Sequence, residues 1–524
     1  NSMFGINKQK KLKKNFTPFK EVTESYYPAK VQLLDIKDGE RLIVLLNPKQ
    51  AMAFGINLNN KVQLTKANGE YIVADVSLSE AVLEGSVAIC ADISEKLNFE
   101  NNELVAVSLA ESSSTSYEAI RKKMKGETIS YDEIFAIIKD ISENKLDDTM
   151  MTYYVASSFF YPTTDEEMYQ TAKAMAECGV MFKYPKGEII ADKHCIGGVP
   201  WNETTMILIP LIASLGIKIP KNFSKSITSP AATGECVNVL MNINFNKEGI
   251  EKLVKDQNCC LVRWGGLDLA PADDKLIKVQ YPLSMQSRAK VVSSIMAKKY
   301  AMGVTHSLID IPVGPTAKVS SMKEAKDWKK KFEYVGKKLW MKMSIQITEA
   351  NEVIGNGVGA VMQVREVLRI LQQHSERAAD LENKVIFLAS KIIEEVGLAK
   401  GKEAVKLATH QLVSWAAWEK MQEIIKAQGG NPEVNSESLP LWAHTFDVIA
   451  EKDWVLKMID LHDINAVCRK LGCPVIDQAG LYLYKKTGDK IKKGEVICKL
   501  YAQDEVKLKH GIERRKERSP LHIR

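Results

Sequence analysis

The stretch from Asp192 to Gly216, DKHCIGGVPWNETTMILIPLIASLG, combines residue types that bind an anion. Lys193 can supply a point charge, while Gly197 and Gly198 let the backbone approach a ligand closely. Two threonines that follow the glycines offer hydroxyl donors. A phosphate group is the anion that this set suits, although on pattern alone a structural loop explains the segment equally well.

The residues on either side predict that this loop joins a strand to a helix. EIIAD, which ends at Asp192, is typical of a strand, and NETTMILIPLIASLG is typical of a helix. Asn202 is the expected N-cap of that helix, and Gly216 falls just beyond its end. Unpaired N–H groups and the positive end of the dipole favour an anion at a helix N-terminus.

Other polar segments are weaker candidates. SKSITSPAATGE, Ser224–Glu235, gathers hydroxyl groups among small residues, and an ordinary Ser/Thr/Pro turn is its alternative explanation. GNGVG, Gly355–Gly359, lacks the full spacing of a dinucleotide loop. Asp273–Asp274 is interpreted as a solvated pair near a helix start rather than a catalytic or metal-binding pair. Cys468 and Cys473 have no matching second pair, so no zinc site is expected.

Composition predicts a folded cytoplasmic protein. Apolar residues make up 45% and charged residues 26% of 524 residues, and this length corresponds to roughly three or four domains. Nine cysteines without a pairing rhythm indicate reduced thiols. The basic start lacks the apolar core of a signal peptide, and no stretch of about 18 uncharged apolar residues follows. We therefore expect neither export nor membrane contact.

The formal net charge of +7 is concentrated in two terminal patches, Lys8–Lys14 and Arg514–Arg518. Solvated tails are the simplest interpretation of both patches. Between them the charges are mixed, without the basic stripe and interleaved aromatics of a nucleic-acid surface. Nucleic acid is therefore not an expected partner.

Hydrophobic periodicity predicts a multidomain α/β protein. Short alternating runs with an Asn68-Gly69 turn predict a β-rich N-terminal domain, and Ser112–Ser116 is interpreted as a linker. Helical periodicity follows, with Ser130 and Thr164 as candidate N-caps. The predicted layout is a basic arm (1–28), the β-rich domain (29–111), a helical domain (117–182) on which 285–304 packs, an α/β domain (183–284 and 305–430), a C-terminal α+β module (431–508) and a basic tail (509–524).

Five ordered segments resemble the motifs of the nucleoside phosphorylase-II family: DKHCIGG, SxxITSPAxT, WGGLDLAPADD, SSIMAKK and DIPVGPTAKV. The resemblance covers roughly Ala29 to Tyr501 and is to the AMP phosphorylases and type 2 thymidine phosphorylases of that family. It implies the same domain order and a homodimer or larger homo-oligomer. It also implies phosphorolysis of a nucleoside 5′-monophosphate or a pyrimidine nucleoside, in which inorganic phosphate attacks the anomeric carbon. No cofactor or metal is implied.

The resemblance also implies roles for individual residues. His194 would lie beside the sugar and the leaving base, and Lys193 and Gln286 are the other catalytic candidates. Phosphate contacts are implied at Lys193, Gly197, Gly198, Thr205, Ser224 and Thr233. Nucleotide or base contacts are implied at Ser224, Lys225, Ser226, Ile227, Thr228, Ser229, Thr233, Lys278, Ser294, Lys298 and Lys318. Closure of the helical domain onto the α/β domain would exclude water, which competes with phosphate.

Several positions depart from the family pattern. Where the family loop reads GGVPGNRTT, Trp201 replaces a glycine and Glu203 replaces an arginine. A tryptophan in a glycine-type backbone region costs about 1–3 kcal/mol, and a carboxylate at a helix N-terminus competes with a bound anion. Gln286 stands where the AMP phosphorylases carry a proton-donating aspartate, and an amide cannot act as a general acid.

Lesser departures are Lys225, Ala232, Asn238 and Lys278, of which Lys278 keeps the charge of the expected arginine without its bidentate geometry. Three functions therefore stay open at this point. The protein is a working phosphorylase with altered substrate preference, an impaired relative that binds nucleotide or acts as a scaffold, or a phosphoribosyltransferase-like cousin.

Overall fold

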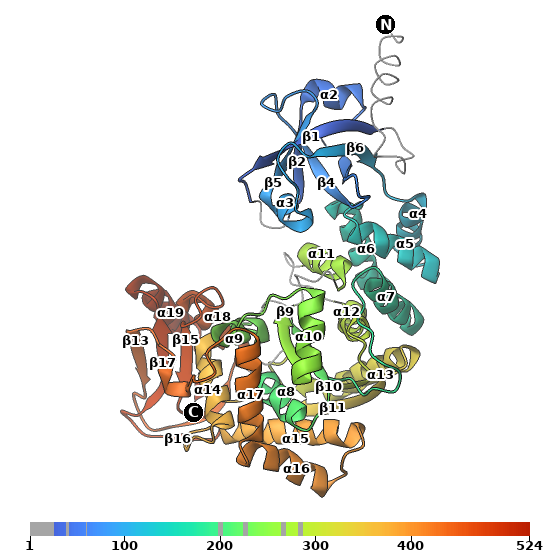
Figure 1. The fold of residues 1–524 in the computed structure, drawn as a ribbon. Coiled ribbons are helices and arrows are strands. Elements are labelled where there is room, and N and C mark those ends of the chain that lie inside the picture. The colour runs from blue at the N-terminus through green and yellow to red at the C-terminus, as the bar shows by residue number, and fades with distance from the viewer. Residues whose placement is uncertain are drawn as a thin grey trace, which may run out of the picture. The chain divides into compact units, whose positions relative to one another are not determined.

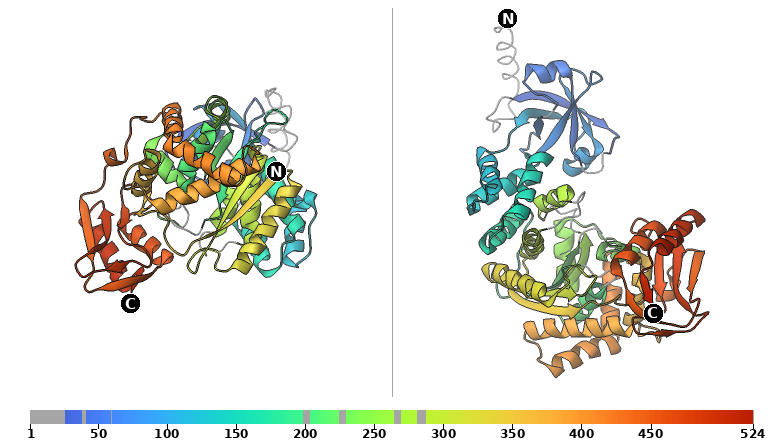
Figure 2. Two further views of the ribbon diagram at one scale, coloured as in Figure 1. Left: turned by 90° about the horizontal axis from the view of Figure 1, so that it is seen from below. Right: turned by 180° about the vertical axis from the view of Figure 1, so that it is seen from behind.

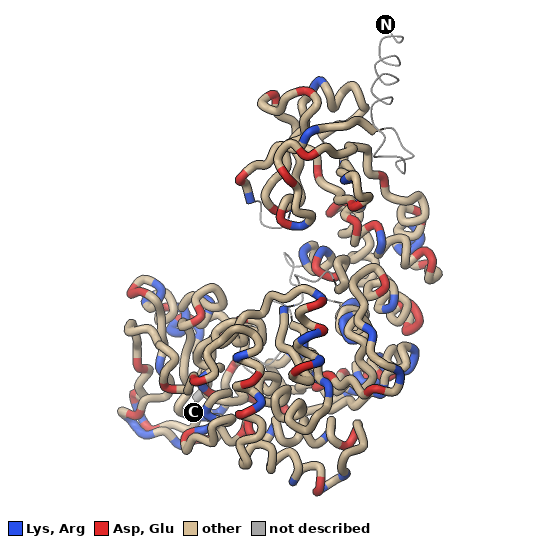
Figure 3. The backbone as a smooth tube through the Cα atoms, viewed as in Figure 1, with Lys and Arg blue, Asp and Glu red and all other residues tan. Residues whose placement is uncertain are grey.

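The computed structural model describes residues 26–37, 41–58, 60–197, 203–223, 229–263, 269–280 and 287–523. Its contacts divide the chain into two units, coloured along the sequence in Figure 1. The first unit comprises Asn1–Pro162 and Lys275–Pro282, and the second comprises Thr163–Asp274 and Leu283–Arg524. Acidic and basic residues are interspersed along the described chain of each unit (Figure 3), as the mixed central sequence predicts.

The β-rich domain at the start of the first unit is a closed barrel with the strand order β1-β5-β2-β4-β3-β6. Its strands are β1 (Tyr26–Leu34), β2 (Ile43–Leu46), β3 (Lys61–Thr65), β4 (Tyr71–Leu78), β5 (Ser86–Cys90) and β6 (Leu104–Ala110), with short helices α2 (Pro48–Ala53) and α3 (Ala91–Leu97). Gly69 has a φ of 89° in the turn between β3 and β4, a conformation that glycine adopts without strain. The Asn68-Gly69 turn predicted from the sequence is confirmed.

Three helices follow the barrel in the first unit: α4 (Ser114–Met124), α5 (Tyr131–Ser142) and α6 (Asp148–Phe160). Ser130 forms the capping box expected at the start of α5. The interpretation of Ser112–Ser116 as a linker is wrong, because Ser113 caps α4 and Ser116 Oγ donates a 2.6 Å hydrogen bond to Asp140. The buried Asp140 carboxylate also accepts a hydrogen bond from the Ser113 backbone N–H, so it gives this segment a partner that local sequence does not reveal.

Five parallel strands form the centre of the second unit. The order β11-β10-β7 joins β11 (Lys342–Glu349), β10 (His306–Val313) and β7 (Ala191–Cys195), while β8 (Ile219–Phe223) pairs with β9 (Cys259–Arg263). A parallel bridge between Ile190 and Lys218 links the two groups. Because every pairing is parallel, the carboxyl ends of all five strands point the same way.

Helices surround these strands, as the views in Figure 2 show. Most of one large apolar core comes from α8 (Thr204–Ser214), α14 (Ala360–Leu371), α15 (Ala379–Glu395) and α17 (Ala416–Ala427). Further helices around these strands are α9 (Thr233–Leu240), α10 (Lys247–Gln257), α11 (Pro271–Gln280, whose last six residues belong to the first unit), α12 (Arg288–Ala301), α13 (Met322–Lys338) and α16 (Lys402–Val413). The described residues contain no helix with both the length and the apolar character needed to cross a membrane.

The predicted helical domain is divided between the two units. Helices α4 to α6 belong to the first unit, whereas α7 (Asp165–Glu177), capped by Thr164 as expected, belongs to the second. There α7 packs against α12, and Ser293 Oγ donates a 3.0 Å hydrogen bond to the Met168 carbonyl. The helix expected within 285–304 therefore packs on α7.

The C-terminal module contains two small sheets, β12-β15-β17-β13 and β16-β14-β18. Its elements are β13 (His444–Ile449), β14 (Trp454–Ile459), α18 (Leu461–Leu471), β15 (Gly480–Leu483), β16 (Lys490–Ile491), β17 (Val496–Ala502), α19 (Glu505–Glu517) and β18 (Leu521–Ile523), preceded by the short helix η3 (Ser436–Ser438). The prediction of a solvated basic tail over 509–524 is wrong. Arg514 and Arg518 lie 2.9 Å and 2.7 Å from carboxylate oxygens of the buried Asp463, and β18 pairs with β14.

The GNGVG segment contributes a strand to the C-terminal module. Gly357 and Val358 form β12, which pairs antiparallel with β15. A Cβ atom at Gly359 would lie 2.1 Å from the Ala479 carbonyl oxygen, so glycine is required for the close approach of the two backbones. The glycines of this segment therefore serve sheet packing.

Candidate active site

The polar segments singled out in the sequence follow the carboxyl ends of four parallel strands. Ile196 and Gly197 follow β7, and Gly314 follows β10; Ser224 and Trp264 come next in the sequence after β8 and β9 but lie outside the described residues. In parallel α/β sheets, ligands bind in front of the carboxyl ends of the strands. This edge of the sheet is therefore the candidate site.

Lys193 and His194 lie inside a strand rather than in a loop. The strand predicted to end at Asp192 runs on to Cys195, with Lys193 opposite Leu308 and His194 opposite Ile309 of β10. The polar sequence DKH is not typical of a buried strand, but pairing with β10 provides hydrogen-bond partners for its backbone N–H and C=O groups. Gly197 follows with a φ of 82°, which is consistent with the glycine requirement expected there.

The start of α8 also differs from the prediction. Glu203, not Asn202, occupies the N-cap position, and it makes no capping hydrogen bond with its side chain. Gly216, with a φ of 79°, lies just beyond the helix as expected. Asn202 itself is outside the described residues.

The Lys193 side chain meets the first turn of α8. Its Nζ atom donates a 2.6 Å hydrogen bond to Thr204 Oγ1 and lies 3.5 Å from Thr205 Oγ1. Lys193 is only 1% exposed. A buried ammonium group, two hydroxyl groups and a helix N-terminus thus gather at one point, which is the arrangement that stabilises a phosphate anion.

Asp192, the residue before Lys193 in β7, belongs to a buried ion-pair network. Asp192 carboxylate oxygens lie 2.8 Å from Lys299 Nζ and 3.7 Å from Lys221 Nζ, and Lys221 donates a 2.8 Å hydrogen bond to the Lys193 carbonyl. Burial alone would raise the pKa of Asp192, but these lysines and Lys193 outweigh it and hold the pKa below its usual value. Burial lowers the pKa of Lys221 to about 7. Asp192 therefore stays ionised at neutral pH.

His194 is held in the neutral state. Burial, followed by the charges of nearby lysines, holds its pKa well below the usual range for histidine. Its Nδ1 atom is buried and has no hydrogen-bond partner among the residues that the structure describes. The imidazole can therefore donate or accept one hydrogen bond without adding charge.

Glu203 turns inward, a direction that the sequence left open. Glu203 is 5% exposed, the Thr233 side chain acts to lower the pKa of its carboxyl group, and Oε2 is buried with no hydrogen-bond partner within the described ranges. Burial raises its pKa to about 7, although Lys193 acts in the opposite direction. A carboxyl group thus stands beside the cluster that attracts an anion.

Two predicted nucleotide contacts meet at a residue that the sequence did not single out as a ligand. Ser294 Oγ donates a 2.7 Å hydrogen bond to Asp273 Oδ2, and Lys298 Nζ lies 2.8 Å from the same oxygen. The interpretation of Asp273–Asp274 as a solvated pair is wrong for Asp273, which is 3% exposed. The sequence signal that could have identified Asp273 is its position in the first turn of α11, within the WGGLDLAPADD motif.

The remaining predicted site residues are less defined. Lys318 Nζ lies 3.5 Å from the Ile196 carbonyl oxygen, beside the segment that follows β7. Lys278 is exposed on the part of α11 that belongs to the first unit. Ser229 directly precedes Pro230 before α9, and Thr233 is the first residue of that helix. The predicted site residues outside the described ranges are Gly198, Ser224, Lys225, Ser226, Ile227, Thr228 and Gln286, and the departure at Trp201 also lies outside them.

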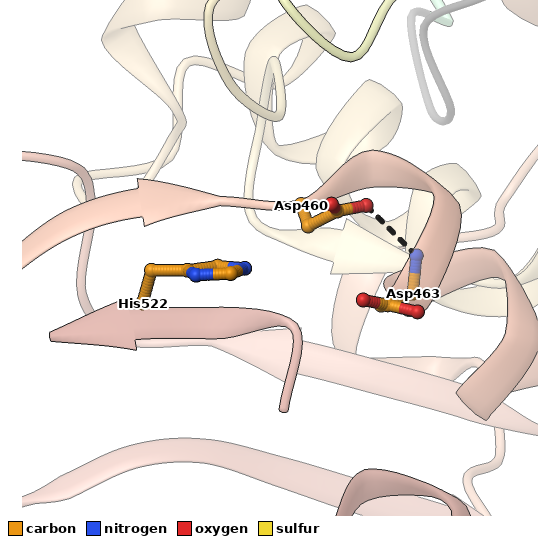
Figure 4. Close-up of side chains that lie close together, drawn as sticks. All are labelled: Asp460, Asp463 and His522. Atoms are coloured by element: carbon orange, nitrogen blue, oxygen red, sulfur yellow. Dashed lines mark hydrogen bonds between the residues drawn. The ribbon is translucent and has the colours of Figure 1, made fainter. Parts of the chain in front are cut away.

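One cluster of metal-ligand residue types occurs among the described residues, in the C-terminal module: Asp460, Asp463 and His522 (Figure 4). Asp460 caps α18 by accepting hydrogen bonds from the N–H groups of His462 and Asp463. Asp463 already pairs with two arginines. Because both carboxylates have these partners, the cluster is explained as part of the fold.

Comparison with known proteins places the chain in a family. Residues 117–179 match the helical bundle domain of the glycosyl transferase family, and residues 455–521 match the pyrimidine nucleoside phosphorylase C-terminal domain. AMP phosphorylase from Pyrococcus furiosus is 36% identical over 495 residues, which cover 94% of this chain and 97% of that protein. The chain belongs to the nucleoside phosphorylase family. This finding confirms the resemblance stated from the five motifs.

A second relative and one solved structure extend the comparison. A putative thymidine phosphorylase from Bradyrhizobium diazoefficiens is 39% identical over 391 residues, covering 74% of this chain and 75% of that protein. The crystal structure of anthranilate phosphoribosyltransferase from Thermus thermophilus covers 59% of this chain and 99% of its own, with a TM-score of 0.50 and 13% identity. That similarity is one of fold alone.

Proposed function

We propose that this protein is a phosphorylase that cleaves the glycosidic bond of a nucleoside 5′-monophosphate or a pyrimidine nucleoside. An oxygen of inorganic phosphate forms a bond to the anomeric carbon, the bond to the base breaks, and a sugar-1-phosphate and the free base leave. The observation that carries the proposal is the buried Lys193 against Thr204 and Thr205 at the N-terminus of α8. Family membership supports the same reaction.

The site suits the attacking anion electrostatically. Lys193 and the first turn of α8 would hold phosphate, together with Gly197 and Thr233. Burial of the ammonium group makes its attraction for an anion stronger than in water, and the helix N–H groups are already oriented. Phosphate held in this way is positioned for attack without a metal ion.

The other half of the reaction needs contacts to the nucleotide. In our proposal Ser294 and Lys298 contact the nucleotide, with Asp273 fixing the geometry of both side chains. His194, being neutral, would hydrogen-bond the sugar or the departing base rather than supply charge. Gln286 and the serine-rich segment Ser224–Thr228 are further proposed contacts, carried by the family motif alone.

The protein as we propose it acts in the cytoplasm as a homodimer or larger homo-oligomer and uses no cofactor. The alternative function, a catalytically impaired scaffold protein, is not supported, because the buried lysine and both threonines of the phosphate site are in place. Altered substrate preference is the consequence that we assign to the departures at Trp201, Glu203 and Gln286.

The deciding experiment measures phosphate-dependent release of free base. The full chain would be incubated with AMP, CMP, UMP, thymidine or uridine, with and without phosphate, and the base quantified by chromatography. Release that depends on phosphate for at least one substrate is the expected result. A folded protein, shown by its circular dichroism, that releases no base from any of the five would overturn the proposal.

A further inference from the structure

Glu203 occupies the place where an anion would be stabilised. It directly precedes the first turn of α8, and its neighbours in sequence, Thr204 and Thr205, face the Lys193 ammonium group. Thr233, the first residue of α9, also acts on the pKa of this carboxyl group, so Glu203 stands near a second helix N-terminus. Its Oε2 atom is buried and has no hydrogen-bond partner in the described part of the chain.

The charged groups around Glu203 come from three elements. Lys193 on β7 and Lys221 on β8 favour its ionised form, whereas Glu235 on α9 disfavours it. The Cys236 thiol on α9 also interacts electrostatically with Glu203. Burial is the largest effect, and it raises the pKa of Glu203 to about 7. A proton can therefore enter or leave this carboxyl group near neutral pH.

A carboxylate and a phosphate dianion cannot share this cluster without repulsion. Both anions would lie close to Lys193 in surroundings that screen charge poorly. Their mutual repulsion would raise the pKa of one of the two. A protonated carboxyl group removes the repulsion and adds an O–H donor. The unpartnered Oε2 atom is the position from which such a donor could reach a bound anion.

Building on the proposed function, we propose that Glu203 takes up one proton from solvent when phosphate binds and donates it in a hydrogen bond to the bound anion. The proton returns to solvent when the anion leaves. Glu203 is thus a specificity-determining residue that links anion affinity to pH. Above the pH at which free Glu203 ionises, anion affinity falls about tenfold per pH unit, and below that pH this dependence disappears.

Isothermal titration calorimetry with sulfate tests this proposal. Sulfate keeps two negative charges across the range, so every proton taken up comes to the protein. Titrations of the full chain in buffers of different ionisation enthalpy give the number of protons bound per sulfate at about pH 8.5 and about pH 6. Because Lys221 also has a pKa near neutrality, the wild type is compared with Glu203→Gln, which keeps the shape of the side chain.

The expected result is that Glu203→Gln takes up about one proton fewer than the wild type at about pH 8.5, while the two proteins agree at about pH 6. Glu235→Gln, a change of the neighbouring carboxyl group on α9, should keep the wild-type uptake. Equal uptake by the wild type and Glu203→Gln overturns the proposal, as does failure of the wild type to bind sulfate at about pH 6. The pH dependence of wild-type affinity gives a second test that does not require the variant to fold.

Sulfate binding requires no turnover, so the two proposals can fail separately. Proton-linked sulfate binding without base release would refute the proposed function only. Base release without proton-linked sulfate binding would refute the role of Glu203 only.

Discussion

Lys193 Nζ and Thr204 Oγ1 lie 2.6 Å apart, across the junction between β7 and α8. This contact joins residues from the strand and the helix that the loop connects. It brings the positive charge to the helix N-terminus, so both features act on one bound anion.

Lys193→Ala should lower kcat/KM for phosphate by about 10²–10³-fold, because it removes a preorganised charge from the attacking anion. Steady-state kinetics with phosphate as the varied substrate would measure this. Lys218→Met is the matched control, since Lys218 is a half-buried lysine that pairs with Glu188 and lies outside the site. Equal losses in both variants would contradict the assignment of Lys193.

Asp192→Asn should lower the free energy of unfolding by about 3–5 kcal/mol, because it leaves Lys221 and Lys299 buried without their counter-charge. Urea denaturation at neutral pH would measure the loss. The double variant Asp192→Asn, Lys299→Met should recover part of the stability, since it removes one of the uncompensated charges. A single variant as stable as the wild type would show that the network is dispensable.

Asp273→Asn should raise the KM for the nucleotide by about tenfold and change the KM for phosphate much less. The loss corresponds to about 1.4 kcal/mol, close to the lower end of the range for a hydrogen bond to a charged group. The exposed neighbour provides the control, because Asp274→Asn should behave like the wild type. A rise in the KM for phosphate alone would place Asp273 at the other substrate.

Glu203→Gln should stabilise the folded protein at about pH 8 and have little effect at about pH 5. The folded-state pKa of about 7 lies above the ordinary glutamate value of 4.5, so between these two pH values the folded state holds a proton that the unfolded chain has lost. The stabilising contribution of this proton is complete below the lower pKa and is lost as pH rises to about 7, by roughly 3 kcal/mol in total. Urea denaturation of both proteins at the two pH values gives the difference, and an equal effect at both would contradict it.

Local signals in the sequence predicted the parts of the fold that depend on neighbouring residues. Ser130 and Thr164 start helices because each completes a capping box three residues later. Ser113 and Asp273 were misinterpreted because their partners, Asp140 and Lys298, lie far away along the chain. Pattern alone cannot supply such distant partners.

The site was found by its motifs but not in its geometry. DKH contradicts the usual apolar pattern of a buried parallel strand, so the sequence placed Lys193 in a loop although it lies in β7. Lys221 and Lys299 were not singled out, because a buried lysine looks like a surface lysine until its counter-charge is located. Glu203 was noticed as a departure, and only the structure shows that it faces inward.

The pairing of β12 with β15 matters for the design of C-terminal fragments of this protein. A fragment that begins at residue 431, where the sequence suggests a boundary, would lack Gly357 and Val358 and would leave β15 as an uncovered sheet edge. Such edges promote aggregation between chains. The C-terminal module is therefore incomplete without the GNGVG segment, and a fragment or chimaera that carries the module needs residues 355–359 as well.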